Sequence, residues 1–291
     1  MPHDDIPADI PNDIHTHDIH APDIHTPGFM SELCRLALAA GCNAMRYYKN
    51  DRQKNDLHIE RKTDNSPVTI ADKEGEAIIT DGLARLCPHI TVIGEESAAA
   101  NLPAQLGDYF FLLDPLDGTK EFINKQSDFT INIGLIEKTQ PIAGVVYAPA
   151  RARLFFTLGT ARAFELNIEP KMDAPIDIEK ARPIYARPAP QDGLVAVASR
   201  AHNNSATDDF LHKMHVKKTI AIGSSLKICL LATGEADIYP RFGRTMEWDI
   251  AAAHAILHAA GGRLTTSDGA PFIYGKLAQA FANPPFIAYG A

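Results

Sequence analysis

The chain lacks any apolar run long enough to cross a bilayer, and it lacks the features of a secretory signal. None of its 291 residues lies in a stretch that approaches the roughly 20 apolar residues of a spanning helix. Residues 1–28 contain neither the basic cluster nor the apolar core that a signal peptide requires. These absences predict a cytoplasmic protein.

Cysteine is scarce, and clusters of basic residues are missing. Cys34, Cys42, Cys87 and Cys229 form no CxxC pair and have apolar neighbours, which is typical of buried thiols rather than of a disulfide framework. Lys and Arg do not gather into the patches that a DNA or RNA surface needs. We therefore expect no disulfides and no nucleic-acid polymer as partner.

Residues 1–27 have no Glu, Lys or Arg, but they contain six Asp and five of the twelve His residues. A segment of this composition buries little apolar surface, so we expect a disordered tail. The tail carries −6 of the net charge of −8, and the rest of the chain is close to balanced. The alternative to a merely solvated tail is metal capture by His3, His15, His17, His20 and His25.

The remaining chain divides into two expected domains. Residues 28–185 are predicted to form an α+β domain that binds metal, and residues 186–291 an α/β domain. The boundary falls in residues 167–192, which are rich in Pro and charge. Apolar periodicity predicts helices near 31–48, 69–86, 206–214, 225–233 and 250–260. Strands are expected near 90–93, 109–113, 129–136, 142–147, 154–156, 163–166, 194–198, 219–222 and 236–239.

The segment with the clearest chemistry is DPLDGT at 114–119, between an apolar strand and an expected helix. Its two carboxylates stand three residues apart on a turn stiffened by Pro115, so they can converge on one point. Leu116 can add its backbone carbonyl, and Gly118 permits close approach of the chain. Such an oxygen-only ligand set suits Mg²⁺. Taken alone, the segment is equally compatible with a simple turn and helix cap.

Further acids stand at other expected element ends. Glu95 follows a short strand in a GEES turn, and Asp72 lies in the segment VTIAD. Asp249 precedes the Ala-rich helix predicted at 250–260, where it could merely cap that helix. Together with the two acids of DPLDGT, they favour a centre that binds several metal ions.

These motifs carry a family resemblance. GEES, DPLDGT and EWD, in this order, resemble the lithium-sensitive, magnesium-dependent phosphomonoesterases, which include inositol monophosphatases, fructose bisphosphatases and bisphosphate nucleotidases. TDNSPVTIAD, IGSSLKICLLATGEADIYPRFG and EWDIAAAHAIL resemble bacterial 3'(2'),5'-bisphosphate nucleotidases of the CysQ type. The resemblance extends from about Met30 to the C-terminus. It implies a layered αβαβα sandwich that combines α+β and α/β features.

The resemblance implies how the acids would share two to three Mg²⁺ ions. Glu95, Asp114 and the Leu116 carbonyl would hold one ion, and Asp114, Asp117 and Asp249 a second. Two cations about 3.5–4 Å apart can activate water and neutralise the phosphoryl oxygens. We therefore expect in-line attack by metal-bound water and no covalent phosphoenzyme.

Other residues would complete the reaction centre. By resemblance, Asp72 and Glu95 would help to hold a third, weaker ion, and Thr119 would orient the attacking water. The amides at the start of the helix near Gly118 would face the phosphate, which Asp249 would also border.

Three features favour a nucleotide substrate over an inositol phosphate. They are Lys120-Glu121 after DGT, the GSSLK segment at 223–227, and Arg241. By resemblance, Ser224, Lys227 and Arg241 would bind the second phosphate, and His202 would lie beside the adenosine.

The expected reaction is removal of the 3'-phosphate of adenosine 3',5'-bisphosphate, which gives AMP and phosphate. Phosphoadenylyl sulfate is a further candidate substrate, and both belong to sulfur metabolism. The main alternative is an inositol monophosphatase, which shares every metal ligand. Some relatives associate peripherally with the cytoplasmic face of the inner membrane, so the resemblance leaves this location open for the present chain.

Overall fold

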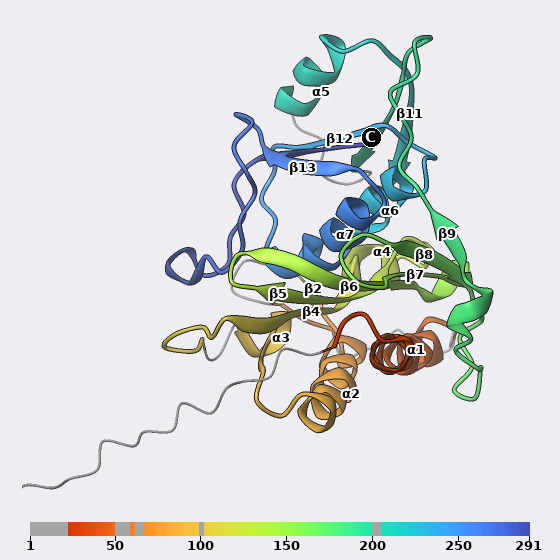
Figure 1. Ribbon diagram of the computed structural model, residues 1–291, viewed down its shortest axis with the longest axis vertical. Coiled ribbons are helices and arrows are strands. Elements are labelled where there is room, and N and C mark those ends of the chain that lie inside the picture. Colours follow the sequence, from red (N-terminus) through yellow and green to blue (C-terminus); the bar gives the residue numbers. More distant parts are fainter. Residues whose placement is uncertain (1–22, 50–58, 62–66, 99–101, 200–204) are drawn as a thin grey trace, which may run out of the picture.

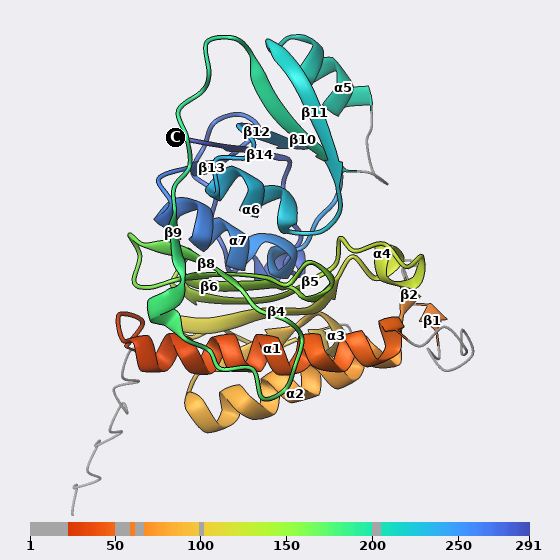
Figure 2. The same cartoon turned by 90° about the vertical axis from the view of Figure 1, so that its right-hand side faces the viewer.

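A computed structural model describes residues 23–49, 59–61, 67–98, 102–199 and 205–291. Its elements form five layers in the order helices, sheet, helices, sheet, helix (Figure 1). The view turned by 90° separates these layers most clearly (Figure 2). The layered αβαβα sandwich that the resemblance implies is thereby confirmed.

The described helices occupy three of these layers. They are α1 (Pro27–Lys49), α2 (Ile70–Leu86), α3 (Glu95–Ala98), α4 (Thr119–Ile123), α5 (Ser205–His212), α6 (Leu226–Ala232) and α7 (Glu247–Ala259). Helices α1 and α2 cover one face of the larger sheet, and α6 and α7 lie between the two sheets (Figure 2). In α1 the buried residues Met30, Leu33, Ala37 and Leu38 recur at helical spacing, which explains both its periodicity and its docking.

The larger sheet has seven strands in the order β3-β4-β5-β6-β7-β8-β9. The β3–β4 pair is parallel, and the pairs from β4 to β9 are antiparallel. Its strands are β3 (Thr91–Gly94), β4 (Tyr109–Asp117), β5 (Thr130–Glu137), β6 (Gln140–Ala148), β7 (Arg153–Thr157), β8 (Ala163–Asn167) and β9 (Arg182–Ile184). A separate two-stranded sheet pairs β1 (Glu60–Arg61) with β2 (Pro67–Val68).

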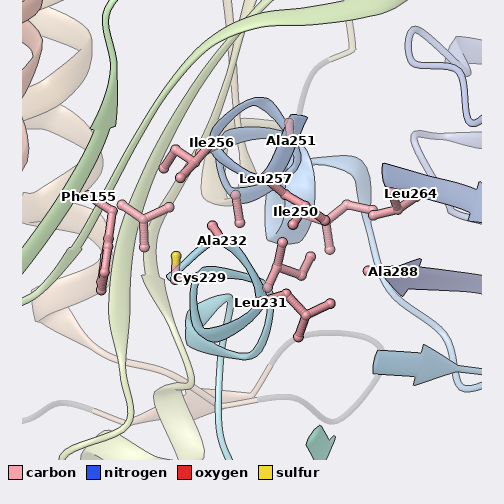
Figure 3. Packing of buried hydrophobic residues seen from close by; sticks show 14 of the residues in the cluster. Phe155, Cys229, Leu231, Ala232, Ile250, Ala251, Ile256, Leu257, Leu264 and Ala288 are labelled. Carbon is pink, nitrogen blue, oxygen red and sulfur yellow. The ribbon is translucent and has the colours of Figure 1, made fainter. Parts of the chain in front are cut away.

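The smaller sheet has five strands in the order β11-β10-β12-β14-β13. They are β10 (Leu194–Ser199), β11 (Val216–Ile222), β12 (Ile238–Arg241), β13 (Arg263–Thr266) and β14 (Phe286–Tyr289). The seven-stranded sheet thus lies within the predicted 28–185 domain and the five-stranded sheet within the predicted 186–291 domain. One buried apolar cluster draws on both, with Phe155, Cys229, Leu231, Ile250 and Leu264 among its members (Figure 3).

Helix α7 approaches the large sheet at two glycines. A Cβ added to Gly144 would lie 2.2 Å from the carbonyl oxygen of Ala252, and one added to Gly134 would lie 2.9 Å from the amide nitrogen of Ala252. Glycine on β5 and β6 and alanine on α7 therefore permit backbone-to-backbone packing that larger side chains would prevent. This close packing sets how near α7 lies to the large sheet.

The fold begins before the boundary predicted at residue 27. Helix α1 starts at Pro27, ahead of the predicted Ser31, because proline at a first helical position has no N–H to satisfy. Ile24 is buried, and its carbonyl accepts a hydrogen bond of 3.0 Å from the Gly159 amide. The preceding part of the predicted tail, with His3, His15, His17 and His20, lies outside the described residues.

Across the described ranges, no helix combines the length and the apolar character that spanning a membrane takes. The four cysteines are all free, and Cys34, Cys42 and Cys229 are buried as predicted, whereas Cys87 is only partly buried.

Candidate active site

The DPLD segment lies in strand β4 rather than in a turn after it. Strand β4 extends to Asp117, and its pairing with β5 is irregular between Asp114 and Asp117. Pro115 cannot donate to the ladder, so a bulge accommodates it. The bulge, not the predicted turn, therefore brings the two carboxylates to the same end of the sheet. Asp114 is 2% exposed, and its Oδ1 accepts a 2.9 Å hydrogen bond from the Leu116 amide.

Three of the predicted acids meet at the end of this strand. Carboxylate oxygens of Glu95, Asp114 and Asp249 lie within 4.8 Å of one another. They come from the first residue of α3, from β4 and from α7, so folding collects acids 154 positions apart in sequence (249 − 95).

The sequence pattern predicted that Asp249 precedes its helix, but the structure places Asp249 inside the helix. It is the third residue of α7, and its Oδ2 accepts a 2.8 Å hydrogen bond from the amide of Met246, the N-cap residue. Asp72 has the same place in α2, where its Oδ2 accepts a 2.8 Å bond from the Thr69 amide. In each case one carboxylate oxygen accepts a hydrogen bond from the amide of the N-cap residue, so that the other oxygen can serve the site.

Thr119 connects Asp72 to the end of strand β4. Its hydroxyl lies 3.1 Å from Oδ1 of Asp72 and 3.1 Å from the Leu116 carbonyl oxygen. Gly118, at φ 93°, forms the N-cap of α4 in the left-handed region, which glycine occupies without strain. Helix α4 has only five residues, so its amides act locally rather than as a long helix dipole.

Asp117 is held by the residue that precedes helix α6. Its Oδ2 accepts a 2.6 Å hydrogen bond from the Ser225 amide. The Ser225 hydroxyl in turn donates to Oδ1 of Asn132 at 2.7 Å and lies 2.9 Å from the Thr130 hydroxyl. The loop before α6 is thereby bonded to β4 and β5.

Burial and the charges of neighbouring acids disturb the titration of four aspartates, Asp72, Asp114, Asp117 and Asp249. Burial raises the pKa of Asp114 well above its usual range, and the charges of Glu95, Asp117 and Asp249 raise it further. Burial and the charges of Asp117 and Glu95 likewise raise the pKa of Asp249. Burial raises the pKa of Asp117 to about 6, against the attraction of Lys227. It raises the pKa of Asp72 to about 6 as well.

These residues fit a divalent cation. Asp114 is buried and Glu95 and Asp249 are partly buried, and carboxylates this close together cannot all be ionised unless positive charge balances them. Their ligand atoms are all oxygen, which hard cations such as Mg²⁺ prefer.

A cleft of about 770 Å³ opens over this cluster. The predicted site residues that line it are Glu95, Asp114, Leu116, Asp117, Gly118, Thr119, Ser224, Lys227, Arg241 and Asp249. Asp72 lies behind it, bonded to Thr119. The remaining predicted residue, His202, lies outside the described residues.

One side of the cleft carries cationic groups. Lys227 is 7% exposed, and burial lowers its pKa to about 8, with the charge of Arg241 acting in the same direction. The Nε of Arg241 is buried and has no hydrogen-bond partner among the described residues. The backbone of Ser224 has φ 52°, which is uncommon for a residue other than glycine. Residues in such strained conformations cluster at functional sites. Unpaired donors beside a cleft are suited to an anionic group.

Sequence reasoning missed several residues of this cleft. Ser225, Tyr239 and Arg244 line it, although they were not among the predicted site residues. Ser225 and Tyr239 stand within or next to predicted motifs, so their position was a usable signal. Arg244 has no such signal, because only the path of the chain after β12 brings it to the cleft.

The chain belongs to the inositol monophosphatase family, whose family model matches residues 29–288. Its similarity to curated relatives is more specific. The 3'(2'),5'-bisphosphate nucleotidase CysQ of Salmonella typhimurium is 38% identical over 258 residues, which cover 88% of this chain and 98% of that relative. The protein of the same name from Buchnera aphidicola is 38% identical over 260 residues, or 89% of this chain and 92% of that relative.

Solved structures agree with this family membership. CysQ from Bacteroides thetaiotaomicron, a bacterial member of the inositol monophosphatase family, superposes with a TM-score of 0.74 at 35% identity, covering 89% of this chain and 96% of that chain. An inositol monophosphatase from Anabaena has a TM-score of 0.67 at 26% identity, and covers 90% of each chain. The resemblance seen in the motifs is thus confirmed over most of the chain.

Proposed function

We propose that the protein is a Mg²⁺-dependent 3'(2'),5'-bisphosphate nucleotidase that converts adenosine 3',5'-bisphosphate to AMP and phosphate. The observation that carries this proposal is the pairing of two kinds of site in one cleft. Acids suited to cations form one side, and Ser224, Lys227 and Arg241 form another. A substrate with two phosphate groups matches this pairing, because one phosphate can meet the cations while the other meets Lys227 and Arg241.

The comparisons add independent support. Curated relatives named 3'(2'),5'-bisphosphate nucleotidase share 38% of residues with this chain over nearly their whole length. Among solved structures, the CysQ protein is 35% identical and the Anabaena inositol monophosphatase 26%. Both observations favour the nucleotidase over the alternative of an inositol monophosphatase.

The acidic residues would hold the cations of the reaction centre. The ligands would be the carboxylates of Glu95, Asp114, Asp117 and Asp249 and the carbonyl of Leu116. When bound, such cations neutralise phosphate charge and make water more acidic. Two to three ions are expected, and Glu95 and Asp72 would help to hold the third.

The proton path would run through Thr119. Its hydroxyl bonds to Asp72, so it can accept a proton from the attacking water while it passes its own proton to Oδ1 of Asp72. A carboxylate whose pKa is about 6 is well matched to this task near neutral pH. Gly118 and Thr119 would position the phosphate by their amides, and His202 would lie beside the nucleoside.

Phosphate release from adenosine 3',5'-bisphosphate, with and without Mg²⁺, tests this proposal. We expect release that requires Mg²⁺, stops with EDTA and yields 5'-AMP by chromatography. Faster turnover of inositol 1-phosphate would favour the alternative, and no release from either substrate would refute both. Phosphoadenylyl sulfate belongs in the same assay as a further substrate. The cytoplasmic location and the peripheral membrane association stay predictions.

A further inference from the structure

Glu76 is a buried carboxylate that the proposed reaction does not use. It lies on α2, one helical turn after Asp72, and is 8% exposed. Its Oε2 accepts a 2.8 Å hydrogen bond from the Glu96 amide, and its Oε1 accepts a 2.8 Å bond from the Ser97 amide. These are the two amides that directly follow Glu95. One side chain of α2 therefore ties down the turn that presents Glu95.

Gly94 provides a second and independent observation at the same place. A Cβ added to Gly94 would lie 2.3 Å from both Cδ and Oε2 of Glu76. Any side chain at this position would displace the carboxylate, since atoms this close overlap. The glycine of the GEES segment thus leaves room for Glu76 beneath the backbone that leads into Glu95.

We propose that Glu76 is a positioning residue that holds Glu95 in the geometry required for cation binding. This inference rests on the metal centre of the proposed function and adds a residue to it. Helix α3 has only four residues, so it cannot fix its own first turn by helical hydrogen bonds. The Glu76 carboxylate supplies those acceptors instead.

Helix α2 contributes two carboxylates to the neighbourhood of the site. Asp72 and Glu76 are four residues apart, so they project from the same face of the helix. Asp72 meets Thr119 through its carboxylate, whereas Glu76 acts on Glu95 through two backbone amides. Residues that orient the ligands of a metal ion commonly change its affinity by about 10–100-fold when they are replaced.

Calorimetric titration of Mg²⁺ into purified Glu76→Gln tests the proposal without relying on turnover. Gln can accept only one of the two amide bonds, so we expect the Kd for Mg²⁺ to rise about 10-fold. Asp81→Asn is the matched control, because it removes an exposed carboxyl from the same helix and should leave the Kd unchanged. Gly94→Ala should weaken binding in the same direction by displacing Glu76.

A kinetic readout separates positioning from a loss of folded protein. For Glu76→Gln we expect the Mg²⁺ concentration for half-maximal activity to rise, with most of kcat recovered at saturating Mg²⁺. A Kd within twofold of the wild-type value in both Glu76→Gln and Gly94→Ala would overturn the proposal. Failure of both variants to fold would also overturn it, because Glu76 would then act on stability. A wild-type protein that binds Mg²⁺ but leaves the nucleotide intact would refute only the proposed substrate.

Discussion

The Ser225 amide donates a hydrogen bond of 2.6 Å to Oδ2 of Asp117, across 108 positions of sequence. This bond joins the start of α6, where Ser224 and Lys227 lie, to strand β4, which carries Asp114 and Asp117. The two sides of the proposed cleft are therefore placed relative to each other by a direct contact. This arrangement and the charges around it lead to five testable expectations.

Ser225→Ala should lower stability more than activity. The substitution removes the hydroxyl bonds to Asn132 and Thr130 but keeps the amide bond to Asp117. A buried acceptor left without its partner costs about 1–3 kcal/mol, so we expect the free energy of unfolding in urea to fall by that amount. Turnover should fall less than about 10-fold, which means that the activation free energy should rise by less than about 1.4 kcal/mol. Ser267→Ala, on the exposed surface, is the control. Equal stability of both variants would contradict the role of this network.

Asp114→Asn should stabilise the metal-free protein while it abolishes metal binding. Asn keeps the acceptor for the Leu116 amide and removes a carboxyl group whose ionisation is opposed by burial and by the charges of its neighbouring acids. We expect Tm in EDTA at pH 8 to rise by about 2–4 °C, the shift that about 1 kcal/mol produces in a domain of this size class. Asp108→Asn, which alters an exposed acid just before β4, should show neither effect. A variant that still gains the wild-type increase in Tm from Mg²⁺ would exclude Asp114 as a ligand.

Binding of Mg²⁺ should release protons, and the number released should fall as pH rises. Burial raises the pKa of Asp72 and Asp117 from 3.8 to about 6, so the folded metal-free protein retains protons that the unfolded chain has lost. The stability that this protonation contributes is complete below pH 3.8 and is lost as pH rises through about 6. Cations favour the ionised carboxylates and expel those protons. Titrations in buffers of different ionisation enthalpy at pH 6 and pH 8.5 measure the effect, and equal release at both would contradict it.

Lys227→Met should weaken binding of the bisphosphate but not of a monophosphate. Met preserves bulk at this buried position and removes the charge that would meet the second phosphate. A hydrogen bond to a charged group contributes about 1.5–3 kcal/mol, so KM for adenosine 3',5'-bisphosphate should rise about 10–100-fold. KM for adenosine 3'-monophosphate should stay near its wild-type value. Lys218→Met, at an exposed position, provides the control.

The same lysine predicts a pH effect in the wild-type protein. Because the pKa of Lys227 is lowered to about 8, its positive charge is present below that pH and is lost above it. KM for the bisphosphate should therefore rise between pH 7 and pH 9, whereas KM for the monophosphate should not follow. Parallel pH profiles for the two substrates would argue against Lys227 as the group that binds the second phosphate.

Much of this site could be predicted because its acidic residues lie in short, characteristic sequence segments. Glu95 directly follows strand β3, and Asp114 and Asp117 lie in the last four residues of the apolar strand β4, and a strand end is where a carboxylate can reach a cleft. The Ala-rich pattern of α7 likewise predicts a buried helix. The exact start of that helix could not be predicted, because Met246 caps it through backbone geometry and not through a capping side chain typical of helix starts.

Local residue types and their periodicity determined the elements of this protein, the acids at their ends and the family to which it belongs. Only the tertiary structure decided that Ser225 holds Asp117, that Glu76 lies beneath Gly94, and that Arg244 reaches the cleft. These contacts join segments far apart in the chain. Those of Ser225 and Glu76 are made through backbone amides, which every residue except proline possesses. No residue type marks such partners, because they are selected by packing between layers and not by local propensity.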